Sequence, residues 1–268
     1  MQRQLKGKVA IVTGGAAGFG EGIVRLFVAQ GARVVIADLD ASRGEKLAAE
    51  LGETARFVRT DVSSGSDVNS LVQTCSREFG DPDIVINNAG TTHTNRPMLE
   101  VDEQTFDRMF AVNVRSHWLL AKACFPLLRE AQGKVVFTTS ISGTNPTTPL
   151  GAYSPCKAAL LMLMRQLSVE WAPKGIRVNA VSPGMTLTPG TSVVYQDPQV
   201  RQQREARIPA RRIGTPQDIA GAVAYLLGPD ADYVHGVELL VDGGLDKTVM
   251  VNPVMDGWRT ARPQSGAN

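Results

Sequence analysis

The chain has 268 residues, of which 43% are hydrophobic, and its 28 Lys and Arg residues nearly balance its 26 Asp and Glu residues. A chain of this length buries a core without disulfide or metal support, and its formal net charge of +2 disfavours nucleic acid or an acidic membrane surface as a partner. The cysteines Cys75, Cys124 and Cys156 lack the paired spacing of a zinc or dithiol site, which predicts free thiols, no metal and a cytoplasmic protein. Because no secretory leader and no bilayer-spanning apolar run is visible, neither secretion nor membrane insertion is expected.

Short β-branched segments alternate with longer segments of helical periodicity from Lys8 to Val241. This alternation is typical of βαβ units in a parallel sheet that is buried on both faces. The expected strands are Val9–Thr13, Arg33–Ala37, Ala55–Thr60, Ile84–Asn87, Lys134–Thr138, Arg177–Val181 and Val237–Val241. The expected helices are Gly18–Gln30, Ala41–Leu51, Ser66–Phe79, Glu103–Glu130, Ala152–Trp171 and Pro216–Leu227. We therefore expect a single α/β domain with a Rossmann-type, doubly wound parallel sheet of about seven strands, and assign no element to Gly190–Arg212 or Asp246–Asn268.

The first expected strand ends in a glycine-rich segment, Thr13-Gly14-Gly15-Ala16-Ala17-Gly18-Phe19-Gly20, that leads into a helix. Glycine lets the backbone turn sharply and approach a ligand, and the N–H groups at the start of a helix can hold a pyrophosphate. Asp38 follows Gly18 by 20 residues, at the end of the second strand, where a carboxylate accepts both ribose hydroxyls and repels a 2′-phosphate. Leu39 adds no cation, so this pattern predicts NAD as the cofactor. The alternative is a structural turn with a solvated Asp38.

Tyr153 and Lys157 lie four residues apart at the start of an expected helix, so their side chains share one helical face. An ammonium beside a phenol favours the phenolate and lowers the pKa of the tyrosine, which suits Tyr153 to general acid–base catalysis. Taken alone, such a pair is more commonly a surface pair. The segment Thr138–Gly143, however, ends the preceding strand at the carboxyl edge of the sheet, where ligands of open α/β folds bind.

Several motifs occur jointly and in order along the chain. They are G-x-x-x-G-x-G after the first strand, Asn87-Asn88-Ala89-Gly90 after the fourth, Ser140 thirteen residues before Tyr153, Tyr153-x-x-x-Lys157, and Pro183-Gly184. With these motifs, the chain resembles the short-chain dehydrogenase/reductase family over roughly Lys6 to Gly244.

The resemblance implies the roles of four catalytic residues. Tyr153 would be the general acid/base, Ser140 would donate to the substrate oxygen, and Lys157 would hold the ribose and lower the pKa of the tyrosine. Asn113, in Ala111-Val112-Asn113-Val114, would anchor a water in the proton relay to Lys157. We would not select Asn113 without the family.

The resemblance also implies the cofactor contacts, with Asp61 and Val62 recognising the adenine. The full set of cofactor-binding residues is Gly14, Gly18, Phe19, Gly20, Asp38, Leu39, Asp61, Val62, Asn88, Ala89, Gly90, Tyr153, Lys157, Pro183, Gly184, Thr186 and Thr188. Thr186 departs from the branched aliphatic residue of many relatives. Its expected contact is largely through the backbone.

The substrate contacts and the assembly are expected from position and resemblance. His93, Ser142 and Asn145 lie in loops at the expected mouth of the site and are candidate substrate contacts. Family resemblance makes residues 1–245 an oxidoreductase domain with a substrate lid at about 186–212. A tail, 246–268, follows the last expected strand, and a separate hypothesis is that its Trp258 covers a neighbouring subunit's site. The arginines of the lid are interpreted as a solvated helix face, with an anionic substrate as the alternative. A homotetramer formed through the two longest expected helices is also implied.

The leading hypothesis is an NAD(H)-dependent oxidoreductase that interconverts a secondary alcohol and its ketone by hydride transfer. Within the family, the alternative is an NADPH-dependent 3-oxoacyl-thioester reductase, which would carry a cation in the phosphate loop or after the second strand. From another class, the alternative is a non-enzymatic dinucleotide-binding sensor. The joint presence of the four catalytic residues favours an enzyme, because a pure binder has no use for an acid/base.

Overall fold

The computed structural model describes residues 4–92 and 95–250, and these form one α/β domain. The strands are β1 (Val9–Thr13), β2 (Arg33–Asp38), β3 (Ala55–Arg59), β4 (Ile84–Asn87), β5 (Lys134–Thr138), β6 (Arg177–Pro183) and β7 (Glu238–Val241). The helices are α1 (Gly18–Ala29), α2 (Ala41–Leu51), α3 (Gly65–Phe79), α4 (Glu103–Phe110), α5 (Ser116–Ala131), α6 (Tyr153–Trp171), α7 (Pro198–Arg207) and α8 (Pro216–Leu227).

All seven strands pair in parallel, in the order β3-β2-β1-β4-β5-β6-β7. The chain winds outward from β1 in one direction and then from β4 in the other, so the strand order reverses between these two neighbours. Ligands of such sheets bind outside the carboxyl ends of the strands at this switch point. The doubly wound, seven-stranded sheet predicted from the sequence is confirmed.

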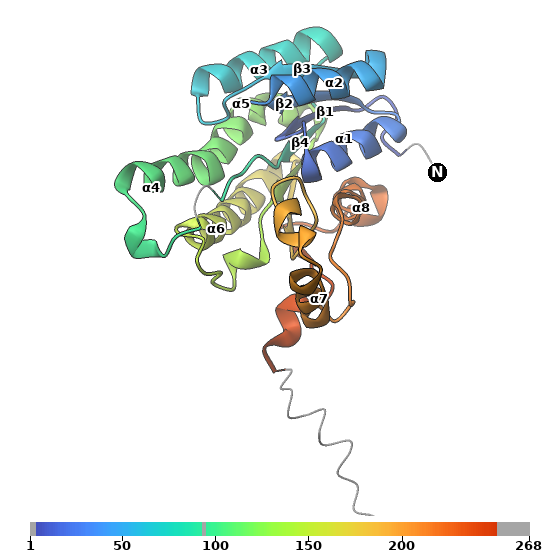
Figure 1. Ribbon diagram of the computed structural model, residues 1–268. Coiled ribbons are helices and arrows are strands. Elements are labelled where there is room, and N and C mark those ends of the chain that lie inside the picture. Colours follow the sequence, from blue (N-terminus) through green and yellow to red (C-terminus); the bar gives the residue numbers. More distant parts are fainter. Residues whose placement is uncertain (1–3, 93–94, 251–268) are drawn as a thin grey trace, which may run out of the picture.

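Helices cover both faces of the sheet, as Figure 1 shows. Val9 and Ile11 of β1 pack with α3, α5 and α6, whereas Ala10 and Val12 pack on the opposite face with α1, α2 and α8. Every residue of β1 is buried. Because both faces are covered, the central strands are continuous apolar runs rather than alternating ones.

The prediction of one continuous helix over Glu103–Glu130 is wrong. This part of the chain consists of α4, a π-helical segment over Ala111–Arg115 (η3), and α5. A π turn adds a residue to the helical repeat and is commonly found at functional sites. Here it contains Asn113, the residue that only the family resemblance singled out.

Regular structure also occurs where none was assigned from the sequence. The segment expected to form the substrate lid, 186–212, contains a 3₁₀ turn over Ser192–Gln196 and the helix α7, whose first turn is capped by Asp197. After β7 the chain forms a 3₁₀ segment over Leu245–Met250 (η8). Trp258 lies outside the described residues. Within the described ranges, no helix is both long enough and apolar enough to cross a bilayer.

Candidate active site

The predicted phosphate loop connects β1 to α1 at the switch point of the sheet. Gly14 has a positive φ of 61° and Gly18 one of 57°, conformations that glycine adopts at low cost. A Cβ on Gly20 would lie 2.0 Å from the Gly14 carbonyl oxygen, so that turn admits only glycine. Ala17 precedes the first turn of α1 and supplies no side-chain acceptor, so the N–H groups there are positioned to bind an anion.

Thr13 links the phosphate loop to the segment after β4 and was missed by the sequence analysis. Its buried hydroxyl accepts hydrogen bonds from Asn88 N at 3.0 Å and Ala89 N at 3.1 Å, and donates to the Ile86 carbonyl at 3.2 Å. Asn88 Nδ2 in turn donates to the Thr13 carbonyl at 2.9 Å. The Oδ1 atom of Asn88 is buried without a hydrogen-bond partner among the described residues. Because a buried acceptor is usually satisfied, a ligand at this edge fits that atom.

Asp38 is held against the phosphate loop. Its Oδ2 accepts from Ala16 N at 3.1 Å and its Oδ1 accepts from Asp40 N at 3.1 Å. The cations nearest in sequence are engaged elsewhere, because Arg33 lies over the Phe79 ring and Arg43 pairs with Asp40. Asp38 therefore places a negative charge beside the expected ribose position. Leu39 follows with 48% of its surface exposed.

The carboxylate of Asp61, after β3, is already bonded within the protein. Its Oδ1 accepts from Ser63 N and Ser63 Oγ, and its Oδ2 lies 3.3 Å from Arg108 Nη2. Partial burial raises the pKa of Asp61, but the Ser63 hydrogen bonds and the charge of Arg108 outweigh it, so the pKa is lowered. Asp61 is thus an ionised acceptor at the expected adenine end, beside the buried Val62.

Tyr153 and Ser140 meet at the carboxyl end of β5. Ser140 follows β5 by two residues, and its Oγ accepts from Ser142 N at 3.1 Å, while Tyr153 is the first residue of α6. Burial raises the pKa of Tyr153, whereas its hydrogen bond with the Ser140 hydroxyl opposes this rise. The expected net lowering of the pKa is therefore not found, because burial outweighs the opposing hydrogen bond, and the effect expected of Lys157 stays a prediction. A desolvated phenol is favoured over a desolvated phenolate in the absence of a nearer positive charge.

Lys157 is 3% exposed, and its side chain lies beside the Tyr153 ring. Its Nζ donates to the Thr138 carbonyl at 3.0 Å and lies 5.6 Å from the centroid of the Tyr153 ring. Burial lowers the pKa of Lys157 to about 8. A Cβ on Gly90 would come within 3.4 Å of this Nζ and 3.0 Å of Asn113 Oδ1, so the lack of a side chain at Gly90 lets these groups converge.

The side-chain amide of Asn113 holds the loop after β4 by hydrogen bonds to its backbone. Its Nδ2 donates to the Thr91 carbonyl at 2.9 Å and to the Met109 carbonyl at 3.0 Å, and its Oδ1 accepts from Thr91 N at 3.0 Å. Both amide hydrogens of Asn113 are therefore used inside the protein. Asn113 Oδ1 and Lys157 Nζ both lie near Gly90, and the Asn113 side chain holds the loop, while its expected role in a water relay stays a prediction.

His117 is a buried imidazole beside Lys157 that the sequence analysis did not assign. It is 1% exposed, packs with its ring centroid 6.0 Å from that of Phe137, and neither ring nitrogen has a hydrogen-bond partner in the described part of the chain. Burial, and then the charge of Lys157, lower the pKa of His117 to about 3, with the Ala89 backbone opposing them. The imidazole is therefore neutral in the folded protein at neutral pH.

His117 predicts an acid sensitivity of the fold. The unfolded chain binds a proton below pH 6.5 that the folded chain does not bind until about pH 3, so stability present above pH 6.5 is lost as the pH falls. At about pH 4.5 the loss amounts to about 2 to 3 kcal/mol. We expect the free-energy difference between His117→Leu and wild type, measured by urea unfolding, to shift by this amount in favour of the variant between about pH 7 and about pH 4.5. A difference that stays constant across this range would contradict the burial of a neutral His117.

The loop after β6 approaches the phosphate loop. Pro183 ends β6, and Gly184 N donates to the Val241 carbonyl at 3.1 Å. Thr186 is buried, and its Oγ1 donates to the Gly184 carbonyl at 3.2 Å. A Cβ on Gly18 would lie 3.5 Å from Thr188 Cβ, so Thr188 borders the expected cofactor path.

The candidate substrate residues are engaged within the protein. The Oγ of the buried Ser142 lies 2.7 Å from Thr147 Oγ1, and Asn145 Nδ2 donates to Asp246. His93 lies outside the described residues. The substrate contacts therefore stay predictions.

The arginines of the lid are largely engaged in contacts within the protein. Arg212 donates two hydrogen bonds of 2.7 Å to Asp218, and Arg201 donates to Glu205 at 2.9 Å. Arg204 lies over the Tyr195 ring. These contacts favour a structural and solvated role over an anion-binding one.

The three cysteines of the chain are unpaired. Cys75, Cys124 and Cys156 are free and buried, which confirms the expected free thiols, and burial raises the pKa of the Cys156 thiol to about 11. Among the described residues, no three His, Cys, Asp or Glu side chains are grouped so as to hold a metal ion.

Comparisons with known proteins extend over almost the whole described domain. A family profile described as "Enoyl-(Acyl carrier protein) reductase" matches residues 14–246. The chain is 40% identical to 4-formylbenzenesulfonate dehydrogenase of Comamonas testosteroni over 90% of this chain and 98% of the relative, and 37% identical to 2-(R)-hydroxypropyl-CoM dehydrogenase of Xanthobacter autotrophicus over 88% and 97%.

A solved structure is also similar. The 3-ketoacyl-(acyl-carrier-protein) reductase from Brucella melitensis, complexed with NADH, aligns with a TM-score of 0.84 and 34% identity over 90% of this chain and 99% of that chain. The profile match, the two dehydrogenases and this reductase each cover most of the chain. The chain therefore belongs to the short-chain dehydrogenase/reductase family, and it is an oxidoreductase that binds a nicotinamide dinucleotide.

Proposed function

We propose that the protein uses NAD(H) to interconvert a secondary alcohol and its ketone, with Tyr153 as the general acid/base. The observation that supports this most directly is the meeting of the Tyr153 phenol and the Ser140 hydroxyl beside the buried ammonium of Lys157. Burial lowers the pKa of Lys157 to about 8 and so disfavours its charged form. A non-enzymatic sensor would have no use for such a buried ammonium.

The residues present fit a nicotinamide dinucleotide. The phosphate loop offers backbone N–H groups and glycines that leave room for a close approach, and Asn88 Oδ1 is a buried acceptor without a partner among the described residues. Residues Asp38, Asn88 and Lys157 would hold the ribose and phosphate groups, with Thr186 and Thr188 bordering the nicotinamide end. When bound, this group supplies the hydride acceptor or donor.

The chain's own residues handle the proton and the developing charge. In the oxidative direction, Tyr153 accepts the proton of the substrate hydroxyl at its phenolic oxygen. In the reductive direction, it returns this proton to the oxygen of the ketone, while the Ser140 hydroxyl donates to the same oxygen. The positive charge of Lys157 favours the phenolate once Tyr153 has lost its proton. Asn113 keeps Thr91 and the loop after β4 in place beside Lys157.

Asp38 supports a preference for NAD(H) over NADP(H). Its carboxylate is fixed by Ala16 N and Asp40 N, and the neighbouring Arg33 and Arg43 are paired elsewhere. A 2′-phosphate at this position would meet the negative charge of Asp38. The related reductase of known structure is complexed with NADH, which agrees with this proposal.

The names of the relatives support an alcohol or carbonyl substrate of modest size. One relative is named for a formylbenzenesulfonate and another for a hydroxypropyl group on coenzyme M. A second candidate is a 3-oxoacyl-thioester reductase, because the structural relative is a 3-ketoacyl-(acyl-carrier-protein) reductase. Asp38 disfavours the NADPH-dependent form of this activity. We propose residues 186–212 as the substrate cover in either case.

We further propose a cytoplasmic homotetramer. The long helices α5 and α6 expose Trp118 by 42%, Met162 by 59% and Val169 by 75%, and apolar side chains of this size are commonly buried between subunits. Three reduced and buried cysteines suit a reducing compartment.

The experiment that tests the function is a paired titration with NADH and NADPH, followed by turnover assays. The substrates are 2-propanol, 2-octanol, cyclohexanol and 1-phenylethanol with the oxidised partner at mildly alkaline pH, and acetoacetyl-CoA with the reduced one. We expect tighter binding of NADH and turnover of at least one alcohol. Binding without any turnover would favour the sensor, and turnover of acetoacetyl-CoA alone would favour the thioester reductase.

Asp38→Asn is the matched variant for this titration, because an asparagine retains an acceptor for Ala16 N but loses the negative charge. We expect the NADH-to-NADPH affinity ratio to fall by about tenfold or more. An unchanged ratio would contradict the role of Asp38.

A further inference from the structure

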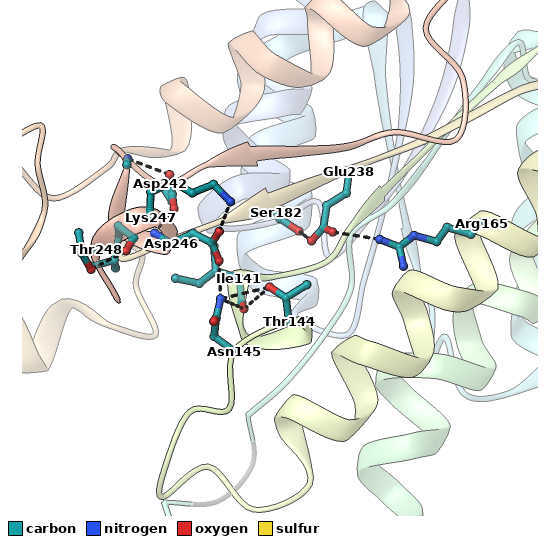
Figure 2. A network of polar contacts seen from close by, with 12 residues as sticks. Ile141, Thr144, Asn145, Arg165, Ser182, Glu238, Asp242, Asp246, Lys247 and Thr248 are labelled. Carbon is teal, nitrogen blue, oxygen red and sulfur yellow. Dashed lines mark hydrogen bonds and ion pairs between the residues drawn. The ribbon is translucent and has the colours of Figure 1, made fainter. Parts of the chain in front are cut away.

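The loop that follows Ser140 is joined to the C-terminal 3₁₀ segment η8 by one side-chain contact, shown in Figure 2. Asn145 Nδ2 donates to Asp246 Oδ1 across a separation of 101 residues. Both residues are half-buried. The sequence analysis took Asn145 as a candidate for direct substrate contact, but its amide nitrogen is already used in this bond.

On one side of this contact, Asn145 is part of the backbone turn that begins at the catalytic serine. Asn145 N donates to the Ile141 carbonyl at 2.9 Å, and Gly143 N donates to the Ser140 carbonyl at 2.8 Å. The loop continues through Thr147, whose hydroxyl pairs with Ser142. A displacement of Asn145 is therefore transmitted along a few hydrogen bonds to Ser140.

On the other side, Asp246 is held by its own surroundings. Its backbone N–H donates to Asp242 Oδ2 at 2.6 Å, its side chain is 11% exposed, and Lys247 Nζ lies 2.6 Å from its Oδ2. The hydrogen bond from Lys247 holds the pKa of Asp246 below its usual range, with Asn145 adding to this against the effect of burial. The acceptor at Asn145 is thus an ionised carboxylate, which makes a stronger hydrogen bond than a neutral one.

The neighbour of Asp246 connects the same segment to the lid. Leu245 packs on the small apolar cluster formed by Tyr195, Ile208, Ile213 and Met185. The segment η8 therefore contacts the lid through Leu245 and the Ser140 loop through Asp246. These two elements are the expected walls of the substrate pocket.

We propose that the Asp246–Asn145 hydrogen bond is a positioning contact that sets the spacing between the Ser140 loop and the lid, and thereby determines how tightly the substrate binds. This inference rests on the proposed function insofar as the substrate lies between these two elements. Neither residue touches the reacting atoms. Their effect is on the shape of the pocket, so it falls on the KM of the substrate and not on dinucleotide binding.

The test uses five variants of the full chain: Asp246→Ala, Asn145→Ala, their double mutant, Asp246→Asn and Lys247→Ala. The substrate is whichever alcohol of the panel above has the highest kcat/KM. We expect Asp246→Ala and Asn145→Ala each to raise its KM by about fivefold or more, with the Kd of NADH unchanged within about twofold. The double mutant should be no worse than the more affected single variant, because both remove the same bond.

Asp246→Asn and Lys247→Ala are the controls. An asparagine oxygen still accepts from Asn145 but lacks the negative charge, so Asp246→Asn should raise the KM less than Asp246→Ala does. Lys247 is exposed and its Nζ contacts the far oxygen of Asp246, so Lys247→Ala should keep the KM within about twofold of wild type. Amide hydrogen exchange of residues 141–150 with NADH bound should accelerate more in Asp246→Ala than in Asp246→Asn.

Two outcomes overturn the inference while leaving the proposed function intact. One is an unchanged KM and unchanged exchange in both alanine variants, and the other is a double mutant whose effect equals the product of the single effects. If wild-type protein turns over no alcohol, the proposed function fails, and the exchange measurement alone then decides whether the contact holds the loop.

Discussion

Tyr153→Phe is expected to lower kcat by about 10³-fold or more, because it removes only the hydroxyl that exchanges a proton with the substrate. Phenylalanine keeps the ring and its packing against Met109, Ala152 and Cys156. Binding of NADH should therefore stay within about twofold of wild type. Stopped-flow and steady-state turnover with the best alcohol, combined with a fluorescence titration of NADH, measure the two quantities.

Tyr225→Phe is the matched control for this substitution. Tyr225 lies on α8 with 46% of its surface exposed and is remote in the chain from the cluster of Ser140 and Lys157. Its hydroxyl should be dispensable. Turnover of Tyr153→Phe within a few-fold of the Tyr225→Phe control would exclude Tyr153 as the acid/base.

Lys157→Met is expected to lower the activity and to raise the stability of the fold. Removal of the ammonium should lower kcat by about 10²-fold or more, because no positive charge is left to favour the phenolate of Tyr153. The same substitution should stabilise the fold at neutral pH by about 2 kcal/mol. Burial lowers the pKa of Lys157 from 10.5 to about 8, so the charged form is disfavoured in the folded chain, and the lost hydrogen bond to Thr138 offsets part of the gain.

The pH dependence of this stability difference has a definite sign. Between pH 8 and 10.5 the unfolded chain binds more protons at this residue than the folded chain, so wild-type stability rises with pH relative to the methionine variant. The advantage of Lys157→Met should be largest below pH 8 and shrink towards pH 10. Urea unfolding of both proteins without added dinucleotide, at about pH 7 and about pH 10, measures this. An advantage that grows with pH would contradict a buried, charged Lys157.

Most of the sheet could be predicted because its strands are continuous apolar runs that are buried on both faces. The strands Val9–Thr13, Ile84–Asn87 and Lys134–Thr138 end where the sequence analysis placed them, since polar or glycine residues follow at the carboxyl edge. The division of the helix at Ala111–Arg115 could not be predicted, because each of its residues is compatible with an ordinary helix.

The helix of the expected lid and the contacts between residues far apart in the sequence were harder to predict. Asp197 followed by Pro198 is a recognisable helix start, and that signal would have located α7. Thr13 and Asp246 act through partners 75 and 101 residues away in the chain, so no local pattern marks them. The pKa of Tyr153 was predicted in the wrong direction because spacing on a helix shows proximity to Lys157 but not the burial of the phenol.

The π-helical segment Ala111–Arg115 has an evolutionary consequence. A π turn holds one residue more than an α turn, so deletion of one residue within this segment would convert it to regular helix and leave α4 and α5 in their present orientations. The bulge that carries Asn113 would be lost, and with it the present hydrogen bonds between the Asn113 amide and the Thr91 backbone. A relative that is one residue shorter between 103 and 131 is therefore expected to keep the packing of these two helices and to hold the loop after β4 by other contacts.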